Sequence, residues 1–206
     1  MPNHPGPAGP RGHVRHTSLA DEPTSPISPR RSRRRGAGAF FVVATLALWL
    51  GWPIVRPLVE VPLYGMRLAS MPKPARLPVP VEGVRPASLR DTWSAPRADG
   101  RRHEGIDIFA RRGTAIRSAT EGIVTRIGTN TLGGNTVWVM GPGGQMHYYA
   151  HLERYATLAR GQRIQAGTPL GYVGNSGNAR DTPPHLHYGI YETGGAINPY
   201  PLLAGR

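Results

Sequence analysis

The feature that most constrains this chain is a stretch of twenty residues, 36–55, that contains no charged side chain. As an α-helix rising about 1.5 Å per residue, it would be roughly 30 Å long, the thickness of the hydrocarbon layer of a bilayer. A helix that packs on one side only would show a polar face, and this stretch, which reads GAGAFFVVATLALWLGWPIV, has none. The stretch therefore predicts a transmembrane helix.

Arginines flank this predicted helix unequally. Five of them lie within residues 30–35, directly before it, whereas only Arg56 follows it closely. Positive charge collects on the cytoplasmic side of a membrane helix, so we expect the N-terminus in the cytoplasm and the rest of the chain outside it. A cleaved secretory signal is the alternative, although the apolar region of such a signal is normally shorter, about 7 to 15 residues.

The rest of the chain divides around this helix. Residues 1–35 are polar and rich in proline, with no apolar period that could seed a core, and are predicted to be a disordered, basic cytoplasmic tail. Residues 56–85 contain six prolines and are predicted to be an extended, semi-rigid linker. Residues 86–206 change in character and are predicted to form one folded domain.

This domain is expected to be mainly β. Short runs rich in β-branched and aromatic residues alternate with glycines, no amphipathic helix is evident, and the GPGG segment at 141–144 is typical of a hairpin loop. We therefore predict a compact antiparallel sheet or sandwich. The expected strands are 105–110, 123–127, 136–140, 146–152, 169–173 and 186–191.

Composition excludes several classes of function. The formal charge of +13 would suit a nucleic-acid-binding protein, but Lys73 is the only lysine and the one dense arginine cluster lies beside the apolar stretch. A membrane explains that cluster better, and no nucleic-acid partner is expected. The chain has no cysteine, which excludes disulfides and thiol nucleophiles, so a metal would have to be bound by His, Asp or Glu.

Two histidine patterns in the domain suit metal binding. His103 and Asp107 are separated by a segment containing Gly105, which lets the chain bend closely enough for an imidazole and a carboxylate to meet. His185 and His187 are i and i+2 on an expected strand, so both imidazoles project from the same face. In a chain without cysteine, this set suits Zn²⁺ with three protein ligands and an open position for water.

A third pattern occurs on the expected strand 146–152, where His147, Tyr149 and His151 alternate with other residues. Strict alternation would place these three side chains on one face and Tyr148 in the core. Tyr149 is therefore a candidate substrate-binding residue, and for His147 a structural role at the strand end or rim is favoured, with a contact to substrate as the alternative.

These patterns together resemble peptidase family M23, the lysostaphin and LytM type of cell-wall metallopeptidase. The segment HEGID at 103–107 is similar to the HxxxD box of that family, YAHL at 149–152 to its YxHL strand, and HLH at 185–187 to its HxH box. The order and spacing of the three boxes also fit, and the resemblance covers roughly residues 81–201.

The resemblance implies a LytM-type β fold and a zinc-dependent endopeptidase. It implies that His103, Asp107 and His187 bind Zn²⁺ and that His151 and His185 are catalytic imidazoles, one as the general base for a metal-activated water and one as a donor to the oxyanion. The sequence does not assign these two roles between them. A non-catalytic wall-binding or amidase-activating module of the same fold is the alternative, and the intact ligand set argues against it.

The resemblance also implies a substrate and a location. The substrate would be the peptide cross-links of peptidoglycan, and a bond between D-Ala and diaminopimelate is favoured over a pentaglycine bridge if the host is Gram-negative. The chain would cross the bacterial inner membrane once, with its C-terminal domain in the periplasm. The sequence indicates no particular protein partner.

Overall fold

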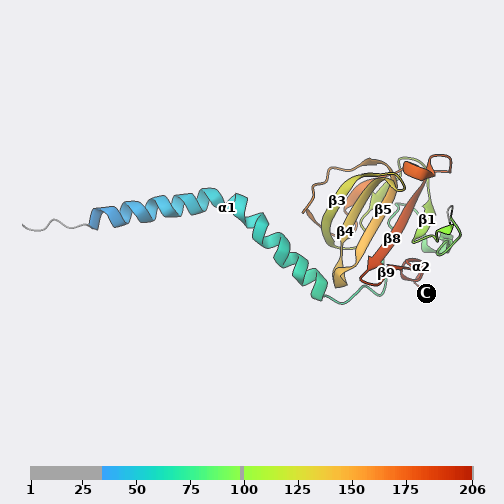
Figure 1. Ribbon diagram of the computed structural model, residues 1–206, viewed down its shortest axis with the longest axis horizontal. Coiled ribbons are helices and arrows are strands. Elements are labelled where there is room, and N and C mark those ends of the chain that lie inside the picture. Colours follow the sequence, from blue (N-terminus) through green and yellow to red (C-terminus); the bar gives the residue numbers. More distant parts are fainter. Residues whose placement is uncertain (1–33, 98–99, 206) are drawn as a thin grey trace, which may run out of the picture. The chain divides into compact units, whose positions relative to one another are not determined.

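The computed structural model describes residues 34–97 and 100–205, and its C-terminal part is a β domain built on one antiparallel sheet (Figure 1). The expected mainly β, antiparallel fold is thereby confirmed. The described residues form nine strands, which are β1 (Ile106–Phe109), β2 (Ala115–Arg117), β3 (Gly122–Asn130), β4 (Gly134–Met140), β5 (Met146–Tyr155), β6 (Arg163–Ile164), β7 (Pro169–Val173), β8 (His185–Glu192) and β9 (Gly195–Ile197).

The main path through the sheet runs β1, β8, β5, β4, β3, β6, while β7 pairs with β2 and β5, and β9 pairs with β8. Strands β3, β4, β5 and β8 lie side by side (Figure 1). The six expected strands correspond to β1, β3, β4, β5, β7 and β8. The sequence missed β2, β6 and β9, which have only two or three residues each and so show no measurable alternation.

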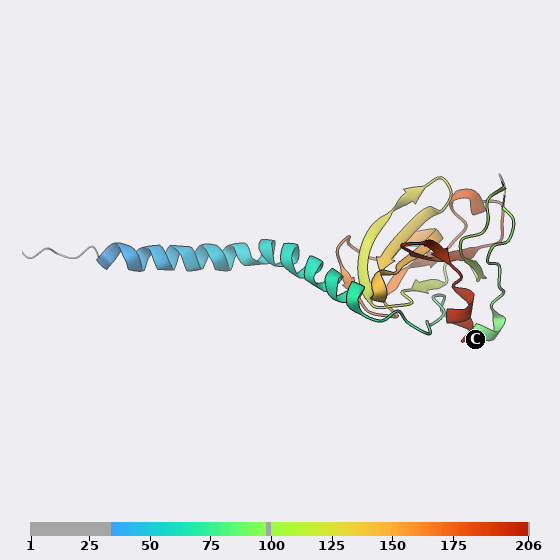
Figure 2. The same ribbon diagram turned by 60° about the horizontal axis from the view of Figure 1, so that its bottom comes forward.

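Short helical segments complete the domain. The GPGG segment turns the chain between β4 and β5, as expected, and α2 lies beside η1 near the C-terminus (Figure 2). These segments are the 3₁₀ turns η1 (Pro86–Ser88), η3 (Pro142–Gly144) and η4 (Gly177–Ala179) and the helix α2 (Tyr200–Ala204).

The core follows from two-residue alternation along the central strands. In β8, Leu186, Tyr188 and Ile190 are fully buried, while His187 between them is only partly buried and belongs to the other face. Strand β8 therefore presents a core face and a cleft face, and the functional residues lie on the second.

The prediction of an extended linker over residues 56–85 is wrong for both halves of this segment. Helix α1 (Arg34–Ser70) continues through Arg56 to Ser70. The chain then packs against the domain: Leu77 donates its backbone N–H to Leu202 and is buried, and Val81 forms a β-bridge with Ile116. A proline can bend a helix without ending it. Apolar residues between prolines stabilise the fold when they leave water and pack into the core.

The predicted membrane helix lies within α1, where the chain is bent. Among the described residues, no single helix has the length and hydropathy of a membrane span. The segments Phe40–Arg56 and Leu58–Ser70 meet that requirement only together, and their axes differ by 41°. The break falls at Pro57, as expected of a residue without a backbone N–H. Most of the predicted tail, residues 1–33, lies outside the described residues.

Candidate metal centre

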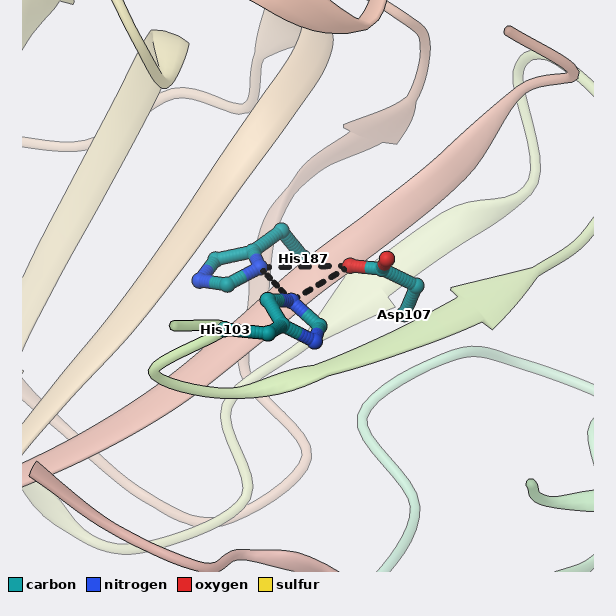
Figure 3. Close-up of side chains that lie close together, drawn as sticks. All are labelled: His103, Asp107 and His187. Atoms are coloured by element: carbon teal, nitrogen blue, oxygen red, sulfur yellow. Dashed lines mark hydrogen bonds and ion pairs between the residues drawn. The ribbon is translucent and has the colours of Figure 1, made fainter. Parts of the chain in front are cut away.

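Three side chains predicted to bind metal converge at the cleft face of β1 and β8 (Figure 3). Asp107 on β1 is the direct register partner of His187 on β8, and His103 precedes β1. Nε2 of His103 lies 2.8 Å from Nδ1 of His187 and 3.0 Å from Oδ1 of Asp107, which lies 3.2 Å from Nδ1 of His187. Segments 84 residues apart in sequence thus bring two imidazoles and a carboxylate to one point.

The loop before β1 orients these groups. Nδ1–H of His103 donates to the backbone carbonyl of Thr92 at 2.6 Å, which leaves the lone pair on Nε2 of His103 pointing at the cluster. The hydroxyl of Thr92 accepts the backbone N–H of Asp107 at 3.0 Å, and Arg97 donates to Oδ2 of Asp107. Such outer contacts fix the tautomer and direction of metal ligands.

Gly105 is required here for close approach. A Cβ at this position would lie 2.5 Å from the carbonyl oxygen of Tyr188 and 2.7 Å from the ring of His187. The sequence argument for Gly105 was a tight bend of the chain. In the structure the reason for the glycine is instead steric, because any side chain at this position would displace the imidazole of His187.

The donor set fits a tetrahedral Zn²⁺ site. Nε2 of His103 and Oδ1 of Asp107 are both electron-rich, and at 3.0 Å they repel each other unless a cation or a proton lies between them. Ligand atoms about 2.0–2.1 Å from a tetrahedral ion lie roughly 3.3 Å apart, close to the separations found here. His103, Asp107 and His187 could therefore hold one divalent cation such as Zn²⁺ between them.

Burial and charge keep these groups in the forms that bind a cation. Burial alone would raise the pKa of Asp107, but the close imidazoles of His103 and His187 outweigh it and hold that pKa below its ordinary value. Burial lowers the pKa of His187, and it lowers the pKa of His151 to about 4. Near neutral pH these shifts favour an ionised Asp107 carboxylate and a neutral His187 imidazole.

The two predicted catalytic imidazoles flank this cluster. The rings of His151 and His185 are 5.0 Å apart, and Nε2 of His185 lies 3.9 Å from Oδ1 of Asp107. Nδ1–H of His151 donates to the backbone carbonyl of Ser176, and Nδ1–H of His185 donates to that of Pro183, each at 2.8 Å. In the neutral form of each ring this hydrogen bond leaves the lone pair on Nε2, where it can accept a proton.

A β-bulge brings His151 into the cleft. Between Tyr149 and Leu152, three residue steps of β5 oppose two steps of β4, and His151 has a φ of 64°, a left-handed value that is uncommon for a residue with a Cβ. Alternation is broken at this point, so His151 lines the cleft together with Tyr148 and Ala150.

The prediction that Tyr149 contacts substrate is wrong, and so is the alternative of a substrate contact for His147. Both are completely buried on the core side of β5, because they precede the bulge and ordinary alternation carries them inward. The hydroxyl of Tyr149 accepts the backbone N–H of Ala119 at 2.9 Å, and Nδ1 of His147 lies 2.7 Å from the hydroxyl of Tyr188. Neither side chain has surface to offer a ligand.

Several residues of the cleft escaped the sequence argument. Thr92 and Arg97 lie in a segment without apolar period, and nothing in the sequence pairs them with Asp107. Phe109 was within reach, because it follows Asp107 by two residues on the same strand and must share its face. Leu132 lines the same cleft from the turn between β3 and β4, whose fold the sequence does not specify.

Comparison with known proteins agrees with this geometry. Residues 101–199 match the family model described as Peptidase family M23. The chain is 39% identical over 128 residues to an L-Ala--D-Glu endopeptidase of Bacillus subtilis, a match that covers 56% of this chain and 39% of that protein. It is 35% identical over 117 residues to the DD-carboxypeptidase/endopeptidase Mpg of Neisseria meningitidis, covering 57% of this chain and 25% of that one. The chain thus spans well under half the length of these relatives.

Solved structures show the same fold. The catalytic domain of lysostaphin from Staphylococcus simulans is 25% identical with a TM-score of 0.50, and the match covers 56% of this chain and 92% of that domain. Helicobacter pylori Csd3 is 30% identical with a TM-score of 0.51, covering 62% of this chain and 33% of that one. With the M23 boxes meeting at one cleft, the C-terminal domain of this chain belongs to peptidase family M23.

Proposed function

We propose that this protein is a zinc-dependent endopeptidase that hydrolyses peptide bonds of peptidoglycan. The observation that carries the proposal is the convergence of Nε2 of His103, Oδ1 of Asp107 and Nδ1 of His187, with two further imidazoles beside them. Relatives whose names describe peptidoglycan DD-endopeptidases, an L-Ala--D-Glu endopeptidase and glycyl-glycine endopeptidases support the substrate class.

The residues divide the chemistry among them. Zn²⁺ held by His103, Asp107 and His187 would lower the pKa of a bound water to about 7 and polarise the scissile carbonyl. Nε2 of one of the two flanking imidazoles, His151 or His185, accepts the proton that the attacking water releases. Nε2 of the other, once protonated, donates a hydrogen bond to the carbonyl oxygen as negative charge develops on it. The carbonyls of Ser176 and Pro183 keep both rings oriented for these roles.

Metal analysis joined to wall digestion tests this function. The purified protein is expected to hold about one equivalent of zinc and to release soluble peptides with new amino termini from purified peptidoglycan. A chelator should stop this release, and added Zn²⁺ should restore it. A zinc-loaded protein that leaves the wall intact but stimulates an added amidase would establish the non-catalytic alternative instead.

The same proposal includes an anchor in the bacterial inner membrane, with the domain outside the cytoplasm. The uncharged stretch 36–55, the arginines before it and the extracytoplasmic location of peptidoglycan support this arrangement. A phosphatase fused after Arg206 is expected to be active in the intact cell envelope. Activity confined to the cytoplasm would contradict the topology while leaving the chemistry of the cleft untouched.

A further inference from the structure

Two large apolar side chains are exposed in the β domain, and both lie in the cleft. Phe109 is 53% exposed and Leu132 is 49% exposed, and among the described residues after α1 no other large hydrophobic side chain is exposed. A single exposed Phe or Leu is ordinary. Their restriction to one cleft that also holds His151 and His185 indicates a surface kept for an apolar part of a ligand.

Phe109 lies directly beside one catalytic imidazole. It faces His185 across the β1–β8 register, and the two ring centroids are 5.0 Å apart. Because Asp107 is two residues earlier on the same strand, the phenyl ring and the metal cluster share one face of the sheet. A group bound against Phe109 is therefore adjacent to the reacting bond.

Leu132 lines the same cleft as the other imidazole, His151, and the two are linked through the backbone. The carbonyl of Leu132 accepts the backbone N–H of Asn178 at 3.0 Å, and the carbonyl of the next residue, Gly133, accepts the backbone N–H of His151 at 2.7 Å. The turn that presents Leu132 is thus fixed to the bulge that presents His151. We call Phe109 and Leu132 the apolar pair.

A second wall of the cleft is cationic. Arg97, Arg101 and Arg102, which we call the arginine wall, line it from the loop before β1. Backbone bonds tie this loop to a metal ligand, because His103 donates its N–H to the carbonyl of Ala95 and Arg97 donates its N–H to the carbonyl of Arg101. The arginines are therefore positioned relative to the metal cluster by the chain itself.

Among the described residues, the carboxylates that line the cleft are those of Glu104 and Asp107. Asp107 belongs to the metal cluster and accepts a hydrogen bond from Arg97. Glu104 accepts a hydrogen bond from the hydroxyl of Tyr191 at 3.2 Å. Arg101 and Arg102 are exposed on the wall, and Arg102 donates from Nη1 to the carbonyl of Ser94 at 3.2 Å, which leaves its other N–H groups, with those of Arg101, as donors for an anionic group of a ligand.

We propose, on the basis of the peptidase function above, that these two walls determine which peptide is cut. The apolar pair contacts alkyl side chains next to the scissile bond, and Arg101 and Arg102 bind a free carboxylate of the same peptide. A direct cross-link between alanine and a diamino acid carries both groups. A pentaglycine bridge has neither methyl groups nor internal carboxylates, so the cleft selects against it.

A binding experiment tests the apolar pair without depending on turnover. The zinc-loaded, full-length His151→Ala protein is titrated by calorimetry with a tetrapeptide dimer joined through a D-alanyl–diaminopimelyl bond, and separately with pentaglycine. We expect the dimer to bind at least about 10-fold more tightly than pentaglycine. Adding Phe109→Ala or Leu132→Ala should weaken dimer binding by about 10-fold each and leave pentaglycine binding unchanged, whereas Phe109→Leu should recover most of the loss.

The arginine wall is tested by its dependence on salt. Arg101→Gln with Arg102→Gln should weaken dimer binding roughly 3- to 10-fold at low ionic strength, and the difference from the parent should shrink in about 0.5 M salt, because exposed charge pairs are screened. Arg160→Gln, at an exposed position outside the cleft, is the matched control and should change nothing. Zinc content must be equal in all variants.

The outcomes separate this inference from the proposed function. Tighter binding of pentaglycine, or dimer binding unaffected by the substitutions in the apolar pair, overturns the inference even if the wild-type protein digests peptidoglycan. A wild-type, zinc-loaded protein that cleaves neither peptide overturns the peptidase function, while the titrations still decide whether the two walls recognise the dimer.

Discussion

Strands β5 and β8 carry a cluster of histidine and tyrosine side chains on the core face and a cluster of histidines on the cleft face, and the two clusters differ in what they can do. On the cleft face, His187 and His151 lie among acceptor atoms that face one another. These atoms repel one another, and a bound cation would stabilise their arrangement. On the core face, His147 contacts the hydroxyl of Tyr188, the hydroxyl of Tyr149 accepts a backbone N–H, and all three side chains are closed off from solvent. The two clusters contain similar residue types. The cleft cluster is open to solvent and its lone pairs converge, so it can be reactive, whereas the core cluster is structural.

The largest difference between the clusters should appear on removing a metal ligand. His103→Ala deletes one of three donors, so we expect loss of bound zinc and of peptidoglycan hydrolysis, with a folded domain by circular dichroism. Zinc is measured by mass spectrometry on the same sample used for digestion. Full hydrolysis by a zinc-free variant would remove the metal centre from the mechanism.

The next effect separates binding of metal from catalysis. His151→Ala removes an imidazole that is not in the ligand set, so zinc should stay bound while kcat falls by about 10²- to 10⁴-fold. The same measurement on His185→Ala compares the two flanking rings, and the pH profiles of the variants identify the proton acceptor. Loss of zinc from His151→Ala would move that residue into the ligand set.

The core cluster should reveal itself through stability. Burial lowers the pKa of His147 from 6.5 to about 4, so between these values the unfolded chain binds a proton that the folded chain does not. The contribution of His147 to the free energy of unfolding is therefore fully present above pH 6.5. It is lost as the pH falls to 4, which lowers the free energy of unfolding by about 3 kcal/mol in total. Denaturant unfolding in detergent, followed by tryptophan fluorescence, should show this extra loss in wild type and not in His147→Gln. Parallel pH curves for the two proteins would contradict it.

The smallest effect tests the correction made for Tyr149. Tyr149→Phe leaves the buried backbone N–H of Ala119 without its acceptor, which should lower the free energy of unfolding by about 1–3 kcal/mol. KM and kcat for peptide hydrolysis should not change in the folded protein. A raised KM at unchanged stability would restore a substrate contact for this residue.

Much of the site was readable in the sequence because its residues come in local patterns. The i, i+2 spacing of His185 and His187 and the spacing of His103 and Asp107 are set by strand geometry over a few residues. The resemblance to M23 peptidases then assigned their roles. The prediction of an extended linker after the membrane helix was wrong. Its prolines lie in a bent helix and in segments that pack on the domain.

The sequence by itself determined the β character of the domain and the ligand types, since alternation, glycine spacing and the absence of cysteine are local properties. Only the tertiary structure decided which face each side chain of β5 occupies, because the bulge at His151 arises from pairing with β4 and reverses the alternation. It also decided that the apolar pair and the arginine wall border the same cleft. Contacts between segments far apart in the chain depend on how the strands pack, and no local pattern encodes them.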